Sequence, residues 1–331
     1  MRFLTLFLLS LSIVFFTACG SKRVYEPKDV KDSWDYYGDI DDEIIDITSN
    51  VALLENQQVL TKTGVIDIEI AENYRLLDAS DGWVISSTVD GKLKLQSEDK
   101  SSQREYDLKK TIAAASIKGD VVAILFTDNE MALYSVSRKE LLLKFQGDET
   151  VVVDSRIINP YFLNDLVLFS TLDGKVVIVN EPEKKKLRTV IVSSEDNFNN
   201  IIYFNVIDNK VVAATAYKIL SMAQKEIREK YEIRNVAYNG KDIFLTTKQG
   251  EIVSLTPDLQ LNSKLKFPFA HFLGLIVKND KVYALEKEGY LIEAPTDLSS
   301  YTVHEVDVDE GFVFVGDNKF YVDDGYISIE K

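Results

Sequence analysis

Residues 241–255 read KDIFLTTKQGEIVSL, and closely similar stretches recur along most of the chain. Each begins with an apolar run rich in β-forming residues, continues through a short turn that usually contains Gly, and ends in an alternating run. This pattern predicts two antiparallel strands joined by a tight turn. The related stretches are residues 82–93 (GWVISSTVDGKL), 165–176 (DLVLFSTLDGKV) and 281–292 (KVYALEKEGYLI). The chain is therefore predicted to be an all-β array of repeated hairpins.

The spacing of the repeats predicts a β-propeller. The first apolar positions of the inner strands are separated by 32 to 45 residues, and they are Val51, Trp83, Val121, Leu166, Val211, Ile243, Val282 and Phe320. A period near forty with about four strands in each unit is typical of propeller blades, whereas helical repeats of this length show 3.6-residue periodicity. We predict an eight-bladed propeller of four-stranded antiparallel blades, with seven blades as the alternative.

Two further details of the ring follow from the sequence. The last unit supplies only three strands, so we expect residues from the Val30 to Tyr37 region to complete it and to close the ring. Trp34 and Tyr36 would then have a structural role. The stretch Ser221–Tyr231 has helical potential, but its alternation also suits strands, which we prefer.

Composition and charge exclude several classes of function. The 331 residues are 46% hydrophobic, which is enough for a large core. The net charge of -15 would repel a phosphate backbone, so we expect no nucleic-acid partner. Cys19 is the single cysteine and His271 and His304 are the two histidines, so neither a disulfide within the chain nor a Cys/His zinc cluster can form.

The N-terminus is predicted to be a targeting segment. Arg2 precedes an apolar run from Phe3 to Phe16, which has the length of a signal-peptide core. The following residues, FTACGS at positions 16–21, resemble a bacterial lipobox, although Phe16 replaces the usual Leu. That resemblance implies lipidation of Cys19, and acyl chains on this residue would hold the protein on a membrane. An ordinary secretory signal that happens to contain a cysteine is the alternative.

These features divide the chain into three parts. Residues 1–18 are the predicted lipoprotein signal peptide, residues 19–42 are the lipidated Cys and an acidic tether, part of which closes the propeller, and residues 43–331 form the propeller. The tether contains the acidic spacing Asp39, Asp41 and Glu43. Because the glycine and the later Glu of an EF-hand loop are missing, we interpret these residues as a solvated acidic face and expect no metal.

A lipobox followed by an eight-bladed propeller resembles the BamB-like lipoproteins of the outer-membrane β-barrel assembly machinery and, more broadly, the PQQ-like repeat propellers. The resemblance covers residues 43–331 as an architecture and implies a scaffold for envelope proteins. Quinone-dependent propeller enzymes carry a repeated Trp and Gly motif, calcium ligands and often paired cysteines. This chain has only Trp34 and Trp83, and one cysteine. We therefore expect the propeller scaffold with no cofactor.

The sequence gives little support for an enzyme. A Ser-His-Asp system would have to use His271 or His304, and both lie in apolar or alternating stretches that favour structural roles. No glycine-rich phosphate loop follows a strand and opens a helix. Paired carboxylates remain open, because the chain has 53 acidic residues. We therefore expect no catalytic residues.

The candidate partner site lies in the loops of the third and fourth units, where the spacing reaches 45 residues. The extra residues fall at positions 146–150 with 154–156, and at positions 193–200. We select Arg156, Asp196 and Phe198 as partner-binding residues. Phe198 is an aromatic residue in a loop of Asn, Asp and Ser, so it either packs on its blade or serves as an anchor for a partner. Insertions without a binding role are the alternative interpretation.

These observations favour a monomeric, lipid-anchored protein-binding scaffold at the outer membrane, facing the periplasm, that assists the assembly of outer-membrane or other envelope proteins. Partners would dock on rim loops or add a strand to an outer blade edge. Gly20 after Cys19, in place of Asp, argues against retention at the inner membrane. Two alternatives stay open: a surface-exposed lipoprotein that binds a ligand or a host protein, and a propeller hydrolase or lyase with a carboxylate site in its central channel.

Overall fold

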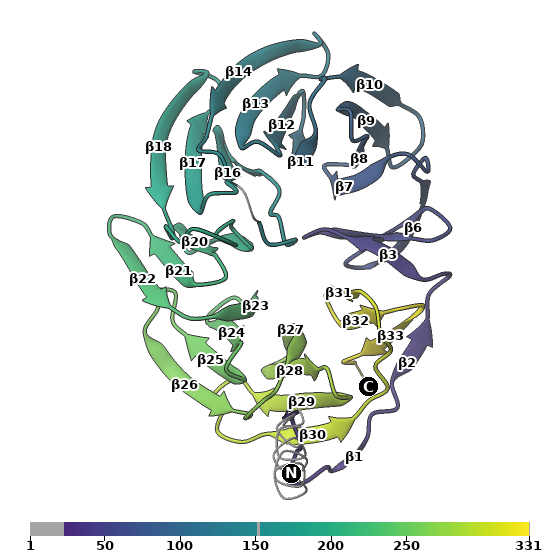
Figure 1. Cartoon of the computed structure of the whole chain (residues 1–331), viewed down its shortest axis with the longest axis vertical. Coiled ribbons are helices and arrows are strands. Elements are labelled where there is room, and N and C mark those ends of the chain that lie inside the picture. The colour runs from purple at the N-terminus through teal and green to yellow at the C-terminus, as the bar shows by residue number, and fades with distance from the viewer. Residues whose placement is uncertain (1–22, 151–152, 331) are drawn as a thin grey trace, which may run out of the picture.

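The chain forms a ring of eight β-sheets around a central channel (Figure 1). The computed structural model describes residues 23–150 and 153–330, and within these ranges the regular structure consists of strands alone. The prediction of an all-β, eight-bladed propeller is confirmed, and the seven-blade alternative is wrong. The stretch Ser221–Tyr231 contains parts of two strands, as preferred from its alternation.

The blades follow one another along the chain, and each runs from an inner to an outer strand. Blades one and two consist of β3 (Ile44–Ile47), β4 (Val51–Leu54), β5 (Gln58–Thr61) and β6 (Gly64–Glu69), then β7 (Arg75–Ser80), β8 (Trp83–Ser87), β9 (Lys92–Ser97) and β10 (Gln103–Asp107). Blades three and four consist of β11 (Ile112–Lys118), β12 (Val121–Phe126), β13 (Glu130–Ser135) and β14 (Glu140–Gln146), then β15 (Tyr161–Leu163), β16 (Leu166–Ser170), β17 (Lys175–Asn180) and β18 (Lys185–Ile191).

The second half of the ring repeats this order. Blades five and six consist of β19 (Tyr203–Ile207), β20 (Lys210–Ala214), β21 (Lys218–Met222) and β22 (Glu226–Lys230), then β23 (Ile233–Tyr238), β24 (Ile243–Thr247), β25 (Glu251–Leu255) and β26 (Leu261–Lys266). Blades seven and eight consist of β27 (Phe272–Lys278), β28 (Lys281–Glu286), β29 (Tyr290–Pro295) and β30 (Thr302–Glu305), then β31 (Val313–Val315), β32 (Lys319–Val322) and β33 (Gly325–Ser328).

The core lies between neighbouring blades. The second strand of each blade is apolar on both faces because each face packs against another blade. One cluster joins Leu77 and Ile85 of blade two to Ile117 and Ile124 of blade three. Outer strands are more polar, and in β18 nearly every residue is exposed. The gradient from apolar inner strands to charged outer strands fixes which edge of each blade faces the channel and which faces solvent.

Two short N-terminal strands close the ring. The strand β2 (Tyr37–Asp39) pairs antiparallel with β33 and supplies the fourth strand of blade eight. The strand β1 (Asp32–Ser33) pairs parallel with β30 and adds a fifth strand to blade seven. The segment expected to close the ring therefore divides between two blades, and the closing strand extends past Tyr37 to Asp39.

Trp34 lies between these two strands and holds both blades together. Its indole is 2% exposed, and its Nε1 donates a hydrogen bond of 2.8 Å to the carbonyl oxygen of Ser328 in blade eight. The ring also packs edge-on against Tyr283 of blade seven and against Tyr36. The structural role expected for Trp34 and Tyr36 is confirmed. N-terminal residues thus join the last blade to its neighbour, as closure of a ring requires.

A backbone hydrogen bond recurs on one side of the ring. In blade six the amide of Phe267, just after the outer strand, donates to the carbonyl oxygen of Gly250 at 2.7 Å. Equivalent bonds join the pairs Leu108 and Gly91, Val192 and Gly174, and Val306 and Gly289. Each links the turn between the second and third strands to the connection that enters the next blade. Both features therefore lie on one face of the disc, which we call the linker face.

Candidate functional site

The two longest connections between blades are residues 147–160 and 192–202, and their described parts lie on the linker face. They leave β14 and β18 and enter β15 and β19, so blade four carries one at each end. The first connection turns into the central channel, as Figure 1 shows for the described residues on either side of positions 151 and 152. There the Nδ2 of Asn159, a buried residue, donates to the carbonyl oxygen of Leu77 at 3.2 Å. The connection is therefore attached to blade two, on another part of the ring.

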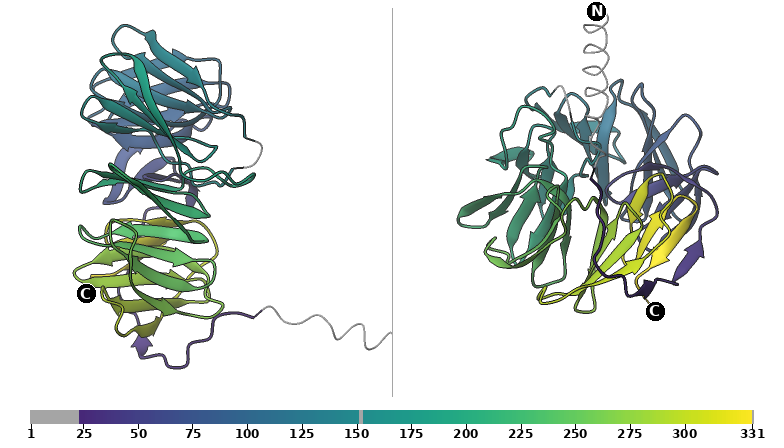
Figure 2. Two further views of the ribbon diagram at one scale, coloured as in Figure 1. Left: turned by 90° about the vertical axis from the view of Figure 1, so that its left-hand side faces the viewer. Right: turned by 60° about the horizontal axis from the view of Figure 1, so that its bottom comes forward.

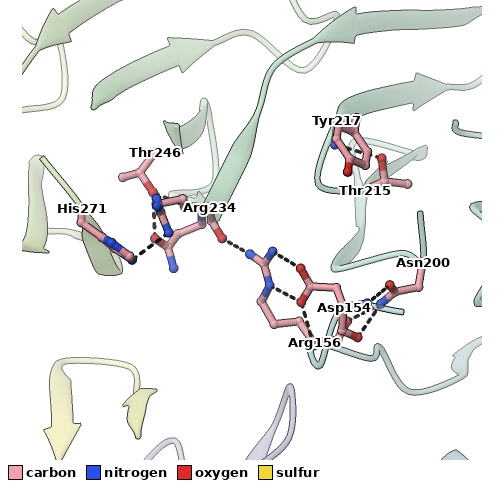
Figure 3. A network of polar contacts seen from close by, with 9 residues as sticks. Asp154, Arg156, Asn200, Thr215, Tyr217, Arg234, Thr246 and His271 are labelled. Carbon is pink, nitrogen blue, oxygen red and sulfur yellow. Dashed lines mark hydrogen bonds and ion pairs between the residues drawn. The ribbon is translucent and has the colours of Figure 1, made fainter. Parts of the chain in front are cut away.

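Arg156 lies inside the channel mouth, not on the outer rim. Its guanidinium forms two contacts with Asp154, from Nε at 2.8 Å and from Nη2 at 2.6 Å. Its Nη1 donates to the backbone carbonyl of Arg234, at the start of blade six (Figure 3). Burial raises the pKa of Asp154, but the hydrogen bonds and the charge of Arg156 outweigh burial and lower it below its ordinary value. Arg156 thus links the connection to blade six.

Asn200 ties the two long connections to each other. Its Oδ1 accepts the amide of Asp154 at 2.6 Å, and its Nδ2 donates to the carbonyl oxygens of Asp154 at 3.1 Å and of Arg156 at 2.8 Å. The side chain of Asn200 is fully buried, so these bonds compete with little water. The loops predicted to carry the partner site are therefore adjacent and fixed to one another.

Phe198 and Asp196 lie on the exposed part of the second connection. Phe198 is 45% exposed and has a φ of +53°, a conformation that bulky residues rarely adopt. Asp196 is exposed as well. These two residues precede Asn200 in the same connection, whereas Arg156 lines the channel. The three predicted residues share one region, but only Phe198 and Asp196 face solvent freely.

The central channel has a volume of about 940 Å³ and is lined mainly by the first strands of the blades. On one wall Asp78 of blade two is buried and accepts hydrogen bonds from Asn50 of blade one at 3.0 Å, Ser80 at 2.7 Å and Ser116 of blade three at 2.9 Å. One carboxylate thereby joins three blades. Three donors satisfy it, as a buried charge requires. No group of three or more His, Cys, Asp or Glu side chains among the described residues could hold a metal ion.

On the opposite wall, Arg234 lies beside His271, and Figure 3 shows Arg234 between His271 and Arg156. The Nη1 of Arg234 is 2.8 Å from Nε2 of His271. Because an arginine nitrogen can only donate, this His271 nitrogen accepts and the imidazole is neutral. The backbone amide of His271 donates to the buried carboxylate of Glu286 at 2.8 Å. Burial raises the pKa of Glu286 above its usual value, against the smaller effect of the amides that it accepts.

His304 is also a structural residue. It is 1% exposed, and its Nδ1 contacts Asp32 of β1, while its Nε2 lies 3.6 Å from a carboxylate oxygen of Glu293. Its ring packs edge-on against Trp34 at 4.9 Å between centroids. The two histidines thus contact arginine, backbone and carboxylate groups. Sequence reasoning expected structural roles for both.

The N-terminal segment reaches the linker face. Tyr25 is buried between Phe267, which follows blade six, and Tyr290 of blade seven, with ring centroids 6.0 Å and 5.7 Å away. Figure 2 shows the segment leaving the disc on the side where the described residues next to positions 151 and 152 also project. Cys19 and the predicted signal peptide lie outside the described residues. Within the described ranges no helix has the length and hydrophobicity needed to cross a membrane.

Comparison with solved structures identifies proteins with the same architecture. BamB from Moraxella catarrhalis superposes with a TM-score of 0.67 over 89% of this chain and 98% of that protein, at 11% identity. The architecture is that of a BamB-like propeller. The C-terminal WD40 domain of Sif2 also superposes, with a TM-score of 0.65 over 92% of this chain and 100% of that domain, at 11% identity. At such identities the likeness to both proteins concerns the fold alone.

Sequence comparison identifies relatives whose name states a role. The plasminogen-binding protein PgbB of Helicobacter pylori is 25% identical in strain J99 and 24% identical in strain 26695, over 94% of this chain in both cases. The chain spans about two thirds of the length of these relatives, 66% in both comparisons. No family model matches the chain.

The sequence predicted two long loops, but not the residues that hold them in place. Asn200 was included only as part of the second loop, and Arg234 and Asn159 were not selected. A charged residue at the start of an inner strand, as Arg234 is in β23, would have been a usable signal because inner strands face the channel. No local pattern marks Asn159 or Asn200, since their hydrogen-bond partners are distant in sequence.

Proposed function

We propose that this protein is a lipid-anchored, non-enzymatic protein-binding propeller of the cell envelope, with its partner site on the linker face. The observation that carries the proposal is the common location of the anchor segment and the long connections. Tyr25 is fixed on the linker face by Phe267 and Tyr290, and residues 153–160 and 193–200 lie on this face as well. A partner that contacts those loops would therefore be near the membrane.

The length of the tether supports this geometry. Cys19 precedes Tyr25 by six residues, which span about 20 Å when fully extended. An acyl group on Cys19 would hold the linker face within roughly that distance of the lipid surface. In the BamB-like version of the proposal the protein lies at the outer membrane, faces the periplasm and assists the assembly of outer-membrane proteins. The partners are then envelope proteins, and no cofactor or metal takes part.

A second candidate is a surface-exposed binder of a host protein, and the name of the sequence relatives favours it. The matches to plasminogen-binding proteins cover 94% of this chain, so they include most of the propeller. Both candidates use the same face and the same anchor, but they differ in the side of the outer membrane. Protease treatment of intact cells distinguishes them, since only a surface-exposed propeller is degraded, and plasminogen capture by the purified protein tests the second candidate directly.

Replacement of Phe198 and Asp196 tests the location of the partner site. We expect the double alanine variant to keep its melting temperature within about 1 °C, because exposed side chains contribute little to folding. It should lose most of its capture of a cross-linked envelope partner. Leu187, which is 48% exposed on the outer strand β18, provides the matched control. If Leu187→Ala reduces capture and the loop variant does not, the partner binds the outer blade edge and the proposed site is wrong.

The lipid anchor has its own test. Cys19→Ala should accumulate as an unprocessed precursor that takes up no labelled fatty acid. A variant that is still matured and labelled would exclude lipidation at this residue. The third interpretation, a hydrolase or lyase, receives no support from the channel wall, where Asp78 is held by three structural hydrogen bonds.

A further inference from the structure

We propose that the mouth of the central channel on the linker face is a binding site for a carboxylate, with Arg234 as its main ligand-binding residue and Arg156 as its neighbour. The site is independent of the lipid anchor. The same chemical group could come from a small dicarboxylic acid or from an acidic segment of a protein.

The wall of the central channel carries more cationic than anionic side chains. The whole chain carries a net charge of -15, yet cationic side chains outnumber carboxylates along the channel wall. The lining includes the cations Lys62, Lys118, Arg156 and Arg234 and the carboxylates Asp78 and Asp81. Clefts lined by one sign of charge concentrate field lines and attract ions of the opposite sign. An acidic protein that keeps its channel basic is suited to take an anion there.

Arg234 lacks a carboxylate counter-ion in the part of the chain that the structure describes. Asp154 pairs with Arg156 at 2.6 Å, so that arginine is neutralised. In contrast, no carboxylate oxygen within residues 23–150 and 153–330 lies within 4.0 Å of the Arg234 guanidinium. Its neighbour His271 is neutral, because its Nε2 accepts from Arg234. Buried or half-buried arginines are ordinarily paired with carboxylates, and an unpaired one marks a place where an anion from outside would be stabilised.

One N–H donor of the Arg234 guanidinium is buried without an acceptor among the described residues. The Nε of Arg234 is buried and has no hydrogen-bond partner in the described part of the chain. An unpaired buried donor is costly, and the cost is removed when an acceptor arrives. Burial and the nearby charge of Arg156 lower the pKa of Arg234, so this cation is held at the expense of stability. A carboxylate would relieve both effects.

The shape of the guanidinium and the size of the channel suit a carboxylate ligand. A guanidinium presents parallel N–H groups that match the two oxygens of a carboxylate. The channel of about 940 Å³ is large enough for a small organic acid or a short extended peptide. Ser155, Tyr203 and Asn205 also line the channel and add neutral polar groups. Arg156 and Arg234 add the cationic groups at the linker-face end.

The experiment measures binding of two probes to the full chain by isothermal titration calorimetry, with sodium chloride of equal ionic strength as the blank. Succinate represents a small carboxylate. An acetylated and amidated hexapeptide of alternating Asp and Gly represents a protein segment. Binding of succinate assigns the small-molecule source, and binding of the peptide alone assigns the protein source. If neither probe gives saturable heat beyond the chloride blank, the proposal is overturned.

Two variants test the residues, and they act in opposite directions. Arg234→Gln should weaken binding about tenfold or more, because a charge-assisted hydrogen-bond pair is lost. Asp154→Asn should tighten binding about threefold or more, because Arg156 loses its competing anion. A purely structural role for these residues predicts no gain in Asp154→Asn. Unchanged affinity in Arg234→Gln, or weaker binding in Asp154→Asn, would overturn the assignment even if the other variant fails to fold.

Discussion

Gly250 is the residue of the repeating hairpin whose replacement should destabilise the ring most specifically. It has a φ of +74°, and a Cβ added to it would lie 2.1 Å from the backbone carbonyl oxygen of Phe267. Its own carbonyl accepts the Phe267 amide at 2.7 Å. Gly250→Ala therefore strains the turn and also pushes away the connection into blade seven, including Phe267, which is buried against Tyr25.

The size of the effect follows from these contributions. The left-handed conformation costs a non-glycine residue about 1–2 kcal/mol. Loss of the Phe267 hydrogen bond adds about 1 kcal/mol, and displacement of a buried aromatic residue adds about 1–2 kcal/mol. The total is roughly 3–5 kcal/mol. A folded body of roughly 300 residues has an unfolding entropy near 0.6 kcal/mol/K, so the melting temperature should fall by about 5–8 °C.

Gly240, in the turn between the first two strands of blade six, is the matched control. It has a φ of +92°, but a Cβ added there meets nothing within 4 Å. Gly240→Ala should therefore cost only the backbone strain of about 1–2 kcal/mol, or about 2–3 °C. Differential scanning calorimetry of both variants checks the difference. Equal losses of melting temperature would refute the role assigned to the contact between Gly250 and Phe267.

Three further predictions concern the closure of the ring and its pH dependence. Trp34→Ala should lower the free energy of unfolding by about 3–5 kcal/mol in urea titrations, because a fully buried indole and its hydrogen bond to Ser328 are lost. A loss below about 1 kcal/mol would contradict the role of Trp34 in closing the ring. Deletion of residues 29–37 should lower the melting temperature by several degrees and expose the edge of blade eight. The exposed edge should promote oligomers, which light scattering or gel filtration would detect. A stable monomer would show that the segment is only a tether. Glu286→Gln should make stability less dependent on pH above about 4.5. Because the pKa of Glu286 is raised in the folded state, the wild-type protein loses stability as the pH rises from the unfolded to the folded pKa. An identical slope of stability against pH in both proteins would exclude this titration.

The sequence by itself determined the fold because a propeller is built from local patterns. Each hairpin is specified by alternating residues and by turn residues that accept positive φ, such as Asp81, Asn279 and Gly250. The apolar second strands, such as β12, showed that both faces are covered. Eight copies of one local pattern therefore predicted the blade count, and the missing strand of the last unit predicted that the N-terminal region closes the ring.

Only the tertiary structure decided what the long loops do and where the charges of the channel lie. Arg156 was selected as a rim residue, yet the pairing with Asp154 and the bond to Arg234 place it in the channel mouth. Asn200 joins residues separated by more than forty positions, and no local pattern encodes such a contact. The surroundings of the Arg234 guanidinium, which include no carboxylate within 4.0 Å in the described ranges, likewise depend on the side chains of other blades. Strand patterns repeat with a fixed period and can be read along the chain, whereas these polar contacts connect different blades and form only when the ring has closed.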